Sequence, residues 1–510
     1  MKNKNEDGVH NEFRSQEENK IVTERKEKLK EIQEAYGISY PNQHKPTGRA
    51  KRIIDKYSSL ERNELETQKV RISLAGRIIL RRNQGKTTFC VLKDSTEKIQ
   101  LYLNKEVLGE EKYAYQKLID LGDVVFCSGT IFKTMRGELT VNCDEVKILA
   151  KALQPFPEKF HGLQDPDLRY RNRHIDLAVN TEVKNIFLKR SSIINKIREY
   201  MNSDGFLEVE TPMLHPIPGG ATAKPFITKH NSLDQKMYLR VAPELYLKRL
   251  IIGGFEKVYE LNRSFRNEGI SVRHNPEFTM LEFYAAYQDY NWCMNFTESL
   301  LKDVCKNIVG EKELVWDDHR VDISKPFERL SFENAIYKYF PNLKDANLRS
   351  KKEMTDILKR YELTETIDLD SSSSEMLMVH LFESLVEEKI VQPTFIMDHP
   401  TEISPLARSS EKNPSVSERF ELYIGGKEIA NGFSELNDPQ EQARRMRAQA
   451  MKKDAGDDEA MYFDEEYIRA LEFAMPPAAG CGIGIDRLTM FLTNSHSIRE
   501  VILFPALKRK

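Results

Sequence analysis

The sequence predicts an α+β protein, with an N-terminal five-stranded barrel followed by a larger domain built on an antiparallel sheet. Two observations lead to this fold class. The chain has 510 residues with 40% hydrophobic content, and because single cores stop growing near about 300 residues it must divide into domains. Hydrophobic residues alternate at strand spacing over residues 70–149, whereas strands and helices mix irregularly after the proline-containing segment 154–157. The second pattern is typical of an antiparallel α+β domain.

Charge and cysteine content exclude several protein classes. With 77 Lys and Arg against 79 Asp and Glu the formal net charge is −2, so a nucleic acid must meet a local basic patch, not a histone-like positive field. The six cysteines form no C-x-x-C pair, which disfavours disulfides and structural zinc and favours a cytoplasmic location. The first residues lack a signal-peptide core and no segment reaches the roughly 18 apolar residues of a membrane span. We therefore expect no membrane partner.

Residues 1–69 are predicted to form a helical extension. The first 20 residues are polar, and Leu29, Ile32 and Tyr36 then recur at helical spacing in a charged stretch, which predicts an amphipathic helix. Between residues 45 and 56, five basic side chains accompany one acid, Asp55. Such an excess suits a phosphate backbone, and a solvated charged surface explains it equally well.

Residues 70–150 are expected to form an OB-fold barrel. Five strands are predicted, over residues 70–80, 87–93, 98–103, 123–132 and 138–149, with a helix between the third and the fourth. OB-folds stack unpaired bases on aromatic side chains inside a basic groove, and Phe89 lies near several arginines in sequence, including Arg77. A core position is the competing interpretation for Phe89. Gln100 and Glu138 either bond base edges or simply face water.

The second domain is predicted to span residues 181–510, after a linker at 151–180 that contains several prolines. It opens with a long amphipathic helix, capped by Thr181 and stopped at Gly205. Closely spaced strand pairs then predict an antiparallel sheet. Residues 341–390 are mainly helical in pattern and are interpreted as an inserted subdomain without chemistry.

Three blocks of the second domain stand out as candidates for chemistry. The first, residues 205–212, is a helix stop followed by a short strand and a proline. The second, residues 258–284, predicts two strands around a loop that carries Arg266, Glu268 and His274. The third, residues 480–487, has glycine at alternate positions before Arg487, which leaves one strand face open for a flat ring.

Each block is ambiguous alone, because a short glycine run or a lone histidine is a weak signal. Together, and behind an OB-like barrel, they resemble the three signature motifs of class II aminoacyl-tRNA synthetases, most closely those of the lysine-specific members. The resemblance extends from the N-terminal helix to Pro505. It is most specific in two runs, Arg266-Asn267-Glu268-Gly269-Ile270-Ser271 and Asn431-Gly432-Phe433-Ser434-Glu435-Leu436-Asn437-Asp438.

The resemblance implies a fold, a reaction and partners. It implies a class II catalytic domain with an antiparallel sheet, and a homodimer formed through the first block. The implied reaction uses ATP, with Mg²⁺, to activate L-lysine as lysyl-adenylate and then transfers the lysyl group to the 3′ end of tRNA(Lys). Phosphoryl chemistry of this kind depends on positioning and charge stabilisation, so arginines should dominate the site.

The resemblance also assigns residues to roles. Arg266 and Arg487 are the implied catalytic pair. The implied lysine-binding residues are Gly220, Glu244, Arg266, Glu282, Tyr284, Asn431, Phe433 and Glu435. The implied ATP-binding residues are Arg266, Glu268, His274, Asn275, Phe278, Glu421 and Arg487, with Phe278 stacked on adenine. The implied Mg²⁺ ligands are Glu421 and Glu428, and the implied anticodon readers are Arg77, Phe89, Gln100 and Glu138.

Charge supports the choice of lysine, because acids facing a narrow pocket stabilise a cation and repel aspartate. Without the resemblance, Glu421 and Glu428 read more simply as two surface acids. Two other functions remain open. The chain could be a paralogue that transfers lysine to a protein, which the barrel at residues 70–149 argues against. It could also be a nucleic-acid-binding scaffold without catalysis, which the presence of Arg266 and Arg487 argues against.

Overall fold

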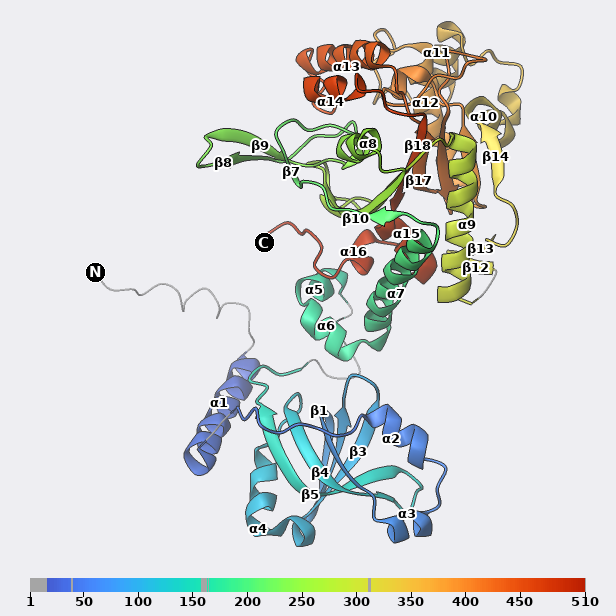
Figure 1. Cartoon of the computed structure of the whole chain (residues 1–510). Helices are drawn as coiled ribbons and strands as arrows, with labels where there is room; N and C mark the ends of the chain where they lie inside the picture. Colours follow the sequence, from blue (N-terminus) through green and yellow to red (C-terminus); the bar gives the residue numbers. More distant parts are fainter. Residues whose placement is uncertain (1–15, 38–39, 157–162, 164, 311–312, 510) are drawn as a thin grey trace. The chain divides into compact units, whose positions relative to one another are not determined.

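The computed structural model describes residues 16–37, 40–156, 163, 165–310 and 313–509 (Figure 1). The chain divides into two compact units, residues 1–162 and residues 163–510. Most of the polar segment predicted over residues 1–20, and the last proline of the segment 154–157, lie outside the described residues. In the part of the chain that the structure describes, no helix combines the length and the apolar character needed to span a bilayer.

The first unit contains a closed five-stranded barrel with the strand order β1-β2-β3-β5-β4. Its ladders are antiparallel except between β3 and β5, which run parallel. Helix α4 stands between β3 and β4, as in an OB-fold, so the sequence prediction of this fold is confirmed. The elements are α1 Gln16–Tyr36, α2 Ala50–Tyr57, α3 Arg62–Gln68, β1 Arg71–Gln84, β2 Thr87–Lys93, β3 Lys98–Asn104, α4 Lys105–Tyr115, β4 Val124–Lys133 and β5 Leu139–Ala150.

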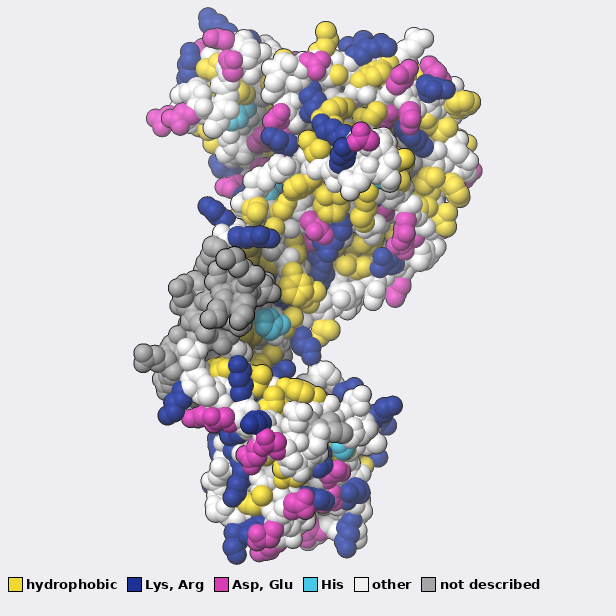
Figure 2. Space-filling view, turned by 90° about the vertical axis from the view of Figure 1, so that its left-hand side faces the viewer, with side chains coloured by type: hydrophobic (Ala, Val, Ile, Leu, Met, Phe, Trp, Pro, Cys, Tyr) yellow, Lys and Arg dark blue, Asp and Glu magenta, His cyan; other side chains and the backbone are white. Residues whose placement is uncertain are grey.

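Helix α1 packs on the barrel unit through one face, as its apolar spacing predicts. Ile32 is fully buried and joins the barrel core, and Leu29 and Tyr36 are half-buried. Arg25 of α1 donates hydrogen bonds to the carbonyl oxygens of Ala152 and Gln154, at 2.6 and 2.8 Å. The basic side chains of residues 45–56 are all exposed, which leaves both interpretations of that segment open. On the face of this unit seen in Figure 2, basic and acidic side chains are interspersed.

The second unit is built on an eight-stranded sheet with the order β14-β15-β16-β17-β18-β11-β10-β6. Only the two outermost pairs, β14 with β15 and β6 with β10, are parallel, so the predicted antiparallel sheet is confirmed. The strands of this sheet are β6 Leu207–Glu208, β10 Lys257–Phe265, β11 Glu277–Ala286, β14 Glu328–Ser331, β15 Thr394–Met397, β16 Arg419–Ile424, β17 Lys427–Ser434 and β18 Ala478–Gly484. Smaller sheets contain β7 Leu214–His215, β8 Ile227–His230, β9 Gln235–Leu239, β12 Glu313–Trp316 and β13 His319–Asp322.

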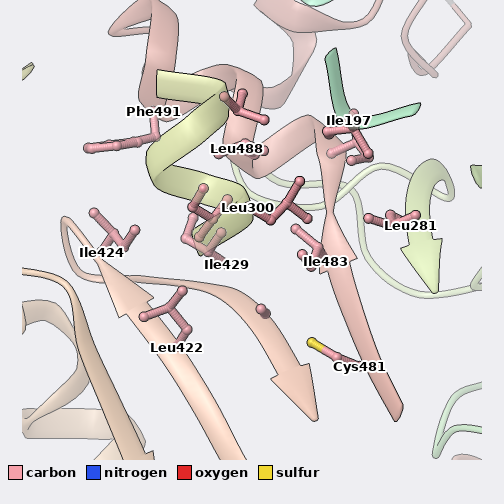
Figure 3. Close-up of a cluster of buried hydrophobic side chains, with 14 of the residues drawn as sticks. Ile197, Leu281, Leu300, Leu422, Ile424, Ile429, Cys481, Ile483, Leu488 and Phe491 are labelled. Carbon is pink, nitrogen blue, oxygen red and sulfur yellow. The ribbon is translucent and has the colours of Figure 1, made fainter. Parts of the chain in front are cut away.

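Helices surround this sheet. They are α5 Pro166–Arg171, α6 Arg173–Val179, α7 Thr181–Ser203, α8 Glu244–Ile252, α9 Tyr290–Ile308, α10 Phe332–Tyr339, α11 Lys351–Arg360, α12 Ser374–Leu385, α13 Pro439–Asp454, α14 Glu465–Leu471, α15 Ile485–Thr493 and α16 Ile498–Val501. Side chains from α7, α9 and α15 meet those of the central strands in one core, where Ile197, Leu300 and Leu488 lie beside Leu422 and Ile483 (Figure 3). Each such side chain contributes roughly 1.5–3 kcal/mol by leaving water.

Two details differ from the sequence analysis and a third agrees with it. The segment 151–180, expected to be a linker, contains α5 and α6, and the buried Arg173 ties α6 to the C-terminal segment through the carbonyl oxygen of Leu503. Asn180, not Thr181, occupies the N-cap of α7, because the chain turns helical one residue earlier than the capping rule indicated. Residues 341–390 are mainly helical, as predicted, and α11 and α12 share a separate apolar cluster.

Candidate active site

The first part of the site is the loop between β10 and β11. The two strands pair from Lys257 with Ala285 to Phe265 with Glu277, and the backbone N–H of Arg266 donates to the carbonyl of Pro276 at 2.9 Å. This bond closes the base of the loop. The Arg266 guanidinium lies 5.2 Å from the centre of the Phe278 ring, so an arginine and an aromatic face are presented together.

His274 lies in this loop beside Arg487. Its Nδ1 is 3.0 Å from the Ser271 hydroxyl and its Nε2 is 3.4 Å from an Arg487 nitrogen. Burial and the neighbouring guanidinium of Arg487 lower the pKa of His274, so the ring is neutral at pH 7 and can accept or donate one hydrogen bond. At pH 7 the positive charge of this loop therefore comes from its arginines and not from His274.

Strand β18 lines one side of the site with glycine residues, which leave space beside the neighbouring side chains. In the ladders, Gly480 lies opposite Tyr284 and Phe433, and Gly482 lies opposite Glu282 and Asn431. A Cβ atom at Gly480 would come within 2.3 Å of the Tyr284 ring and 2.5 Å of Glu435 Oε1. Glycine here therefore makes room for pocket side chains as well as leaving an open face.

The hairpin of β16 and β17 places Glu421 and Glu428 on one face of the sheet. In a regular ladder Glu428 would lie opposite Ile424, on the core side. The register instead shifts between Leu422 and Tyr423, so that Tyr423 lies opposite Glu428. Since side chains alternate along a strand, this bulge moves Glu428 to the side of Glu421.

The turn of this hairpin explains the bulge. Gly425 and Gly426 have φ values of 60° and 68°, a combination that favours a two-residue hairpin loop and that other residues adopt at a cost. A Cβ at Gly426 would also lie 2.9 Å from the Glu388 carbonyl oxygen. A two-residue loop leaves one residue of β17 without a partner, and that residue is Ile429.

Arginines engage both of these carboxylates. Arg419 donates to Glu421 at 2.6 Å and to the side-chain oxygen of Asn431 at 3.1 Å. Arg487 donates to Glu428 at 2.9 Å. The sequence analysis missed Arg419, although its i, i+2 spacing from Glu421 on a strand places both side chains on one face.

A cluster of three buried carboxylates lies at one end of the site, those of Glu244, Glu282 and Glu435, each exposed by 6% or less. Glu244 begins α8, and Gly220 packs beside it with φ 90°. Burial and the nearby Glu244 raise the pKa of Glu282 to about 8. Burial likewise raises the pKa of Glu435 above its ordinary value. The Glu282 carboxyl is therefore mainly protonated at pH 7.

Most of the site residues expected from the sequence line one cavity of about 180 Å³. Among the site residues expected in the second unit, the two exceptions are Glu421, which accepts a hydrogen bond from Arg419, and Glu435, which lies next to Gly480. The cavity residues among those expected are Gly220, Glu244, Arg266, Glu268, His274, Asn275, Phe278, Glu282, Tyr284, Glu428, Asn431, Phe433 and Arg487.

The inserted subdomain reaches this site, which the sequence analysis did not foresee. Arg273 of the β10–β11 loop pairs with Glu387 at 3.7 Å and with Glu388 at 2.5 Å, just after α12. Burial, together with the charge of Glu428, raises the pKa of Glu387 to about 7. Residues 341–390 therefore contact the loop that lines the site, and their interpretation as an inserted subdomain without chemistry stays a prediction.

The four residues expected to read an anticodon lie on the barrel of the first unit. Phe89 is half-buried, outside the barrel core, with its ring 5.0 Å from Tyr102. Gln100 donates to the Thr140 hydroxyl at 2.9 Å, and Glu138 is exposed. Arg77 instead donates to the Gly122 carbonyl and covers the Phe156 ring. The sequence analysis did not find Tyr102, which extends the aromatic surface of Phe89.

Comparison with known proteins assigns a family to both units. Residues 165–508 match the family model described as tRNA synthetases class II (D, K and N), and residues 72–149 match the model of an OB-fold nucleic acid binding domain. The antiparallel sheet, the two arginines Arg266 and Arg487 in the cavity, and the barrel thus define a class II tRNA synthetase.

Relatives that match over almost their whole length identify the family within this class. The chain is 52% identical over 499 residues to a protein of Variovorax paradoxus named lysine–tRNA ligase, covering 97% of this chain and 96% of the relative. Proteins of the same name from Ralstonia nicotianae and Burkholderia multivorans are 51% and 50% identical, each with 97% of both chains covered. The chain belongs to the lysine–tRNA ligase family.

Proposed function

We propose that this chain activates L-lysine with ATP and transfers it to tRNA(Lys). The observation that supports the choice of amino acid is a cluster of three buried carboxylates. Glu244 and Glu282 line a cavity that has Arg266 on its wall, and Glu435 lies next to Gly480, which also lines it. An elongated ligand with two ammonium groups and one carboxylate matches this distribution of charge, whereas aspartate would face like charges.

Within the cavity each group has a role that follows from its place. Glu244 receives the α-ammonium of lysine, Glu282 and Glu435 with Tyr284 receive the ε-ammonium, and Phe433 covers the aliphatic stem. Asn431 and Arg266 bind the lysine carboxylate, and Gly220 leaves room beside Glu244. A lysine carboxylate oxygen held in this way can attack the α-phosphorus of ATP, and pyrophosphate leaves.

Arginine provides the electrostatic stabilisation for this step. Arg266 bonds the α-phosphate oxygens, on which charge accumulates, and Arg487 binds the far side of the nucleotide. Phe278 stacks on adenine, while Glu268, His274 and Asn275 bind ATP. None of these residues needs to act as a nucleophile, since the lysine carboxylate supplies the attacking oxygen.

Mg²⁺ fits the acids of the β16–β17 hairpin. The bulge brings Glu421 and Glu428 to one face, and two carboxylates with substrate phosphates form the kind of site that Mg²⁺ prefers. In the described part of the chain, no group of three or more His, Cys, Asp or Glu side chains is placed to hold a metal ion. When bound, Mg²⁺ neutralises phosphate charge; Arg419 and Arg487 hold the two carboxylates in place.

The barrel binds the anticodon through Phe89, Gln100, Glu138 and the nearby Arg77. Phe89 and Tyr102 offer adjacent rings for stacking of unpaired bases. The six free, buried cysteines support a reducing, cytoplasmic location.

The active form is a homodimer joined through α7 and β6. Strand β6 lies at the edge of the large sheet, and Leu188 and Leu207 are 55% and 47% exposed. Exposed apolar side chains beside an open strand edge favour burial against a second copy of the chain.

One assay tests the proposed function. Pyrophosphate exchange is measured with each of the twenty amino acids, followed by charging of unfractionated tRNA. We expect exchange with lysine and charging of tRNA(Lys). Exchange with aspartate in place of lysine contradicts the assignment of the pocket, exchange with no charging favours a protein acceptor, and absence of both favours a non-catalytic scaffold.

A further inference from the structure

Lys248 is a fully buried lysine that none of the roles above uses. It lies one turn after Glu244 on α8, and its side chain has 0% exposure. Its Nζ is 2.5 Å from Glu244 Oε1 and 2.5 Å from Glu435 Oε2. The Phe433 ring centre lies 5.3 Å away. An ammonium removed from water in this way is strongly unfavourable unless it is paired, and both of its partners are lysine-binding candidates.

The contacts of Lys248 indicate which oxygens remain for a ligand. Its ammonium forms an ion pair with Oε2 of Glu435 at 2.5 Å, whereas Oε1 has no ion-pair partner, and neither oxygen of this buried carboxylate has a hydrogen-bond partner among the described residues. Oε1 points toward the open face at Gly480, where an added Cβ would lie 2.5 Å from it. In the same way Lys248 engages Oε1 of Glu244, whose side chain lines the cavity.

The two carboxylates come from elements that are far apart in sequence. Glu244 stands at the start of α8 and Glu435 follows β17, so a contact shared by both side chains helps to fix the distance between their carboxylates. Lys248 provides that contact. We propose that Lys248 is a positioning residue for substrate selection, because its ammonium holds Glu244 and Glu435 with one oxygen of each directed at the two ammonium groups of a diamino acid.

Charge supports this inference, which rests on the proposed assignment of lysine to the cavity. Once lysine binding has displaced the protons and all three carboxylates are ionised, they and the ammonium of Lys248 leave two uncompensated negative charges, one for each ammonium group of lysine. Burial raises the pKa of Glu435 and Lys248 opposes that rise. Without Lys248 the Glu435 carboxyl would bind a proton more tightly and lose its attraction for an ammonium group.

The test uses Lys248→Met in the full-length protein, with steady-state pyrophosphate exchange as the readout. We expect the KM for lysine to rise at least ~10-fold, as for loss of a charged hydrogen bond, with the KM for ATP unchanged. Because Lys248 acts through Glu435, the rise should shrink in a Glu435→Gln background. Equal rises in both backgrounds, or equal rises for lysine and ATP, overturn the proposal.

Lys151 offers a matched control. It is also fully buried and pairs with two acids, Asp120 at 2.5 Å and Asp123 at 2.8 Å, but lies in the barrel unit. Lys151→Met should leave the KM for lysine in exchange unchanged, since exchange needs no tRNA.

If Lys248→Met does not fold, Lys248→Arg supplies the measurement, because it keeps the charge and changes the geometry. A raised KM for lysine with an unchanged KM for ATP supports the proposal, and an unchanged KM for lysine overturns it. Wild-type protein that fails to exchange with lysine refutes the proposed function itself. Wild-type exchange with no effect at Lys248 refutes only the role of this residue.

Discussion

Replacing Glu435 by glutamine tests the lysine pocket most directly. Lys248 forms an ion pair with Oε2 of Glu435 at 2.5 Å, so in the variant we expect the amide oxygen to turn toward Lys248 and the NH₂ group to take the place of Oε1. A donor then faces the ε-ammonium in place of an ionised acceptor. A hydrogen bond to a charged group contributes about 1.5–3 kcal/mol, which corresponds to a KM for lysine raised about 10- to 150-fold.

The measurement is lysine-dependent pyrophosphate exchange at saturating ATP, repeated with ATP varied. Glu298→Gln is the matched control, since Glu298 pairs with Lys302 on α9, outside the cavity, and should change neither KM. An unchanged KM for lysine in Glu435→Gln would remove this carboxylate from the pocket. An equal rise in the KM for ATP would show that the substitution disturbs the whole site.

Four further predictions follow from the same structure. Phe89→Ala should weaken tRNA charging by about 1–3 kcal/mol, for a lost stack, with exchange intact; equal loss in both assays would mean that Phe89 is merely structural. Leu188→Glu should convert the dimer to monomers, as measured by the molar mass from light scattering. Phe473→Glu, at another exposed apolar position, should leave the dimer intact, and a dimeric Leu188→Glu variant would contradict the α7 interface. The pKa of Glu282 is raised to about 8, so lysine binding at pH 7 should release protons, and the affinity for lysine should rise from about pH 6 to about pH 8. Calorimetry in buffers of different ionisation enthalpy measures the proton release, and zero release would refute this prediction. Glu428→Gln should raise the Mg²⁺ concentration for half-maximal exchange, and an unchanged requirement would exclude it as a ligand.

Much of the fold could be predicted from local patterns. The alternation over residues 70–149 places the five barrel strands within a few residues of their observed ends, because each strand buries one face and exposes the other. The spacing of Leu29, Ile32 and Tyr36 likewise predicts α1. Such patterns are local, and they do not reveal that α5 and α6 fill the segment expected to be a linker.

The candidate site was only partly predictable, since its key geometry depends on pairing between strands. Sequence places Glu421 and Glu428 seven residues apart, but only the observed register assigns both to one face. Lys248 was missed because a lysine at i+4 from a glutamate on a helix is usually an exposed pair. Its burial depends on Glu435, which lies far away in sequence.

The Gly425-Gly426 turn has a consequence for the interpretation of variants. Neither glycine touches a proposed substrate, yet a bulkier residue at either position would favour a longer loop and a regular ladder, with Glu428 on the core side. In a random mutagenesis screen these positions would score as inactivating, and a search for lost ligand contacts would find none. The defect would be a change in strand register that starts at the turn and moves the side chain of Glu428 to the opposite face of the sheet.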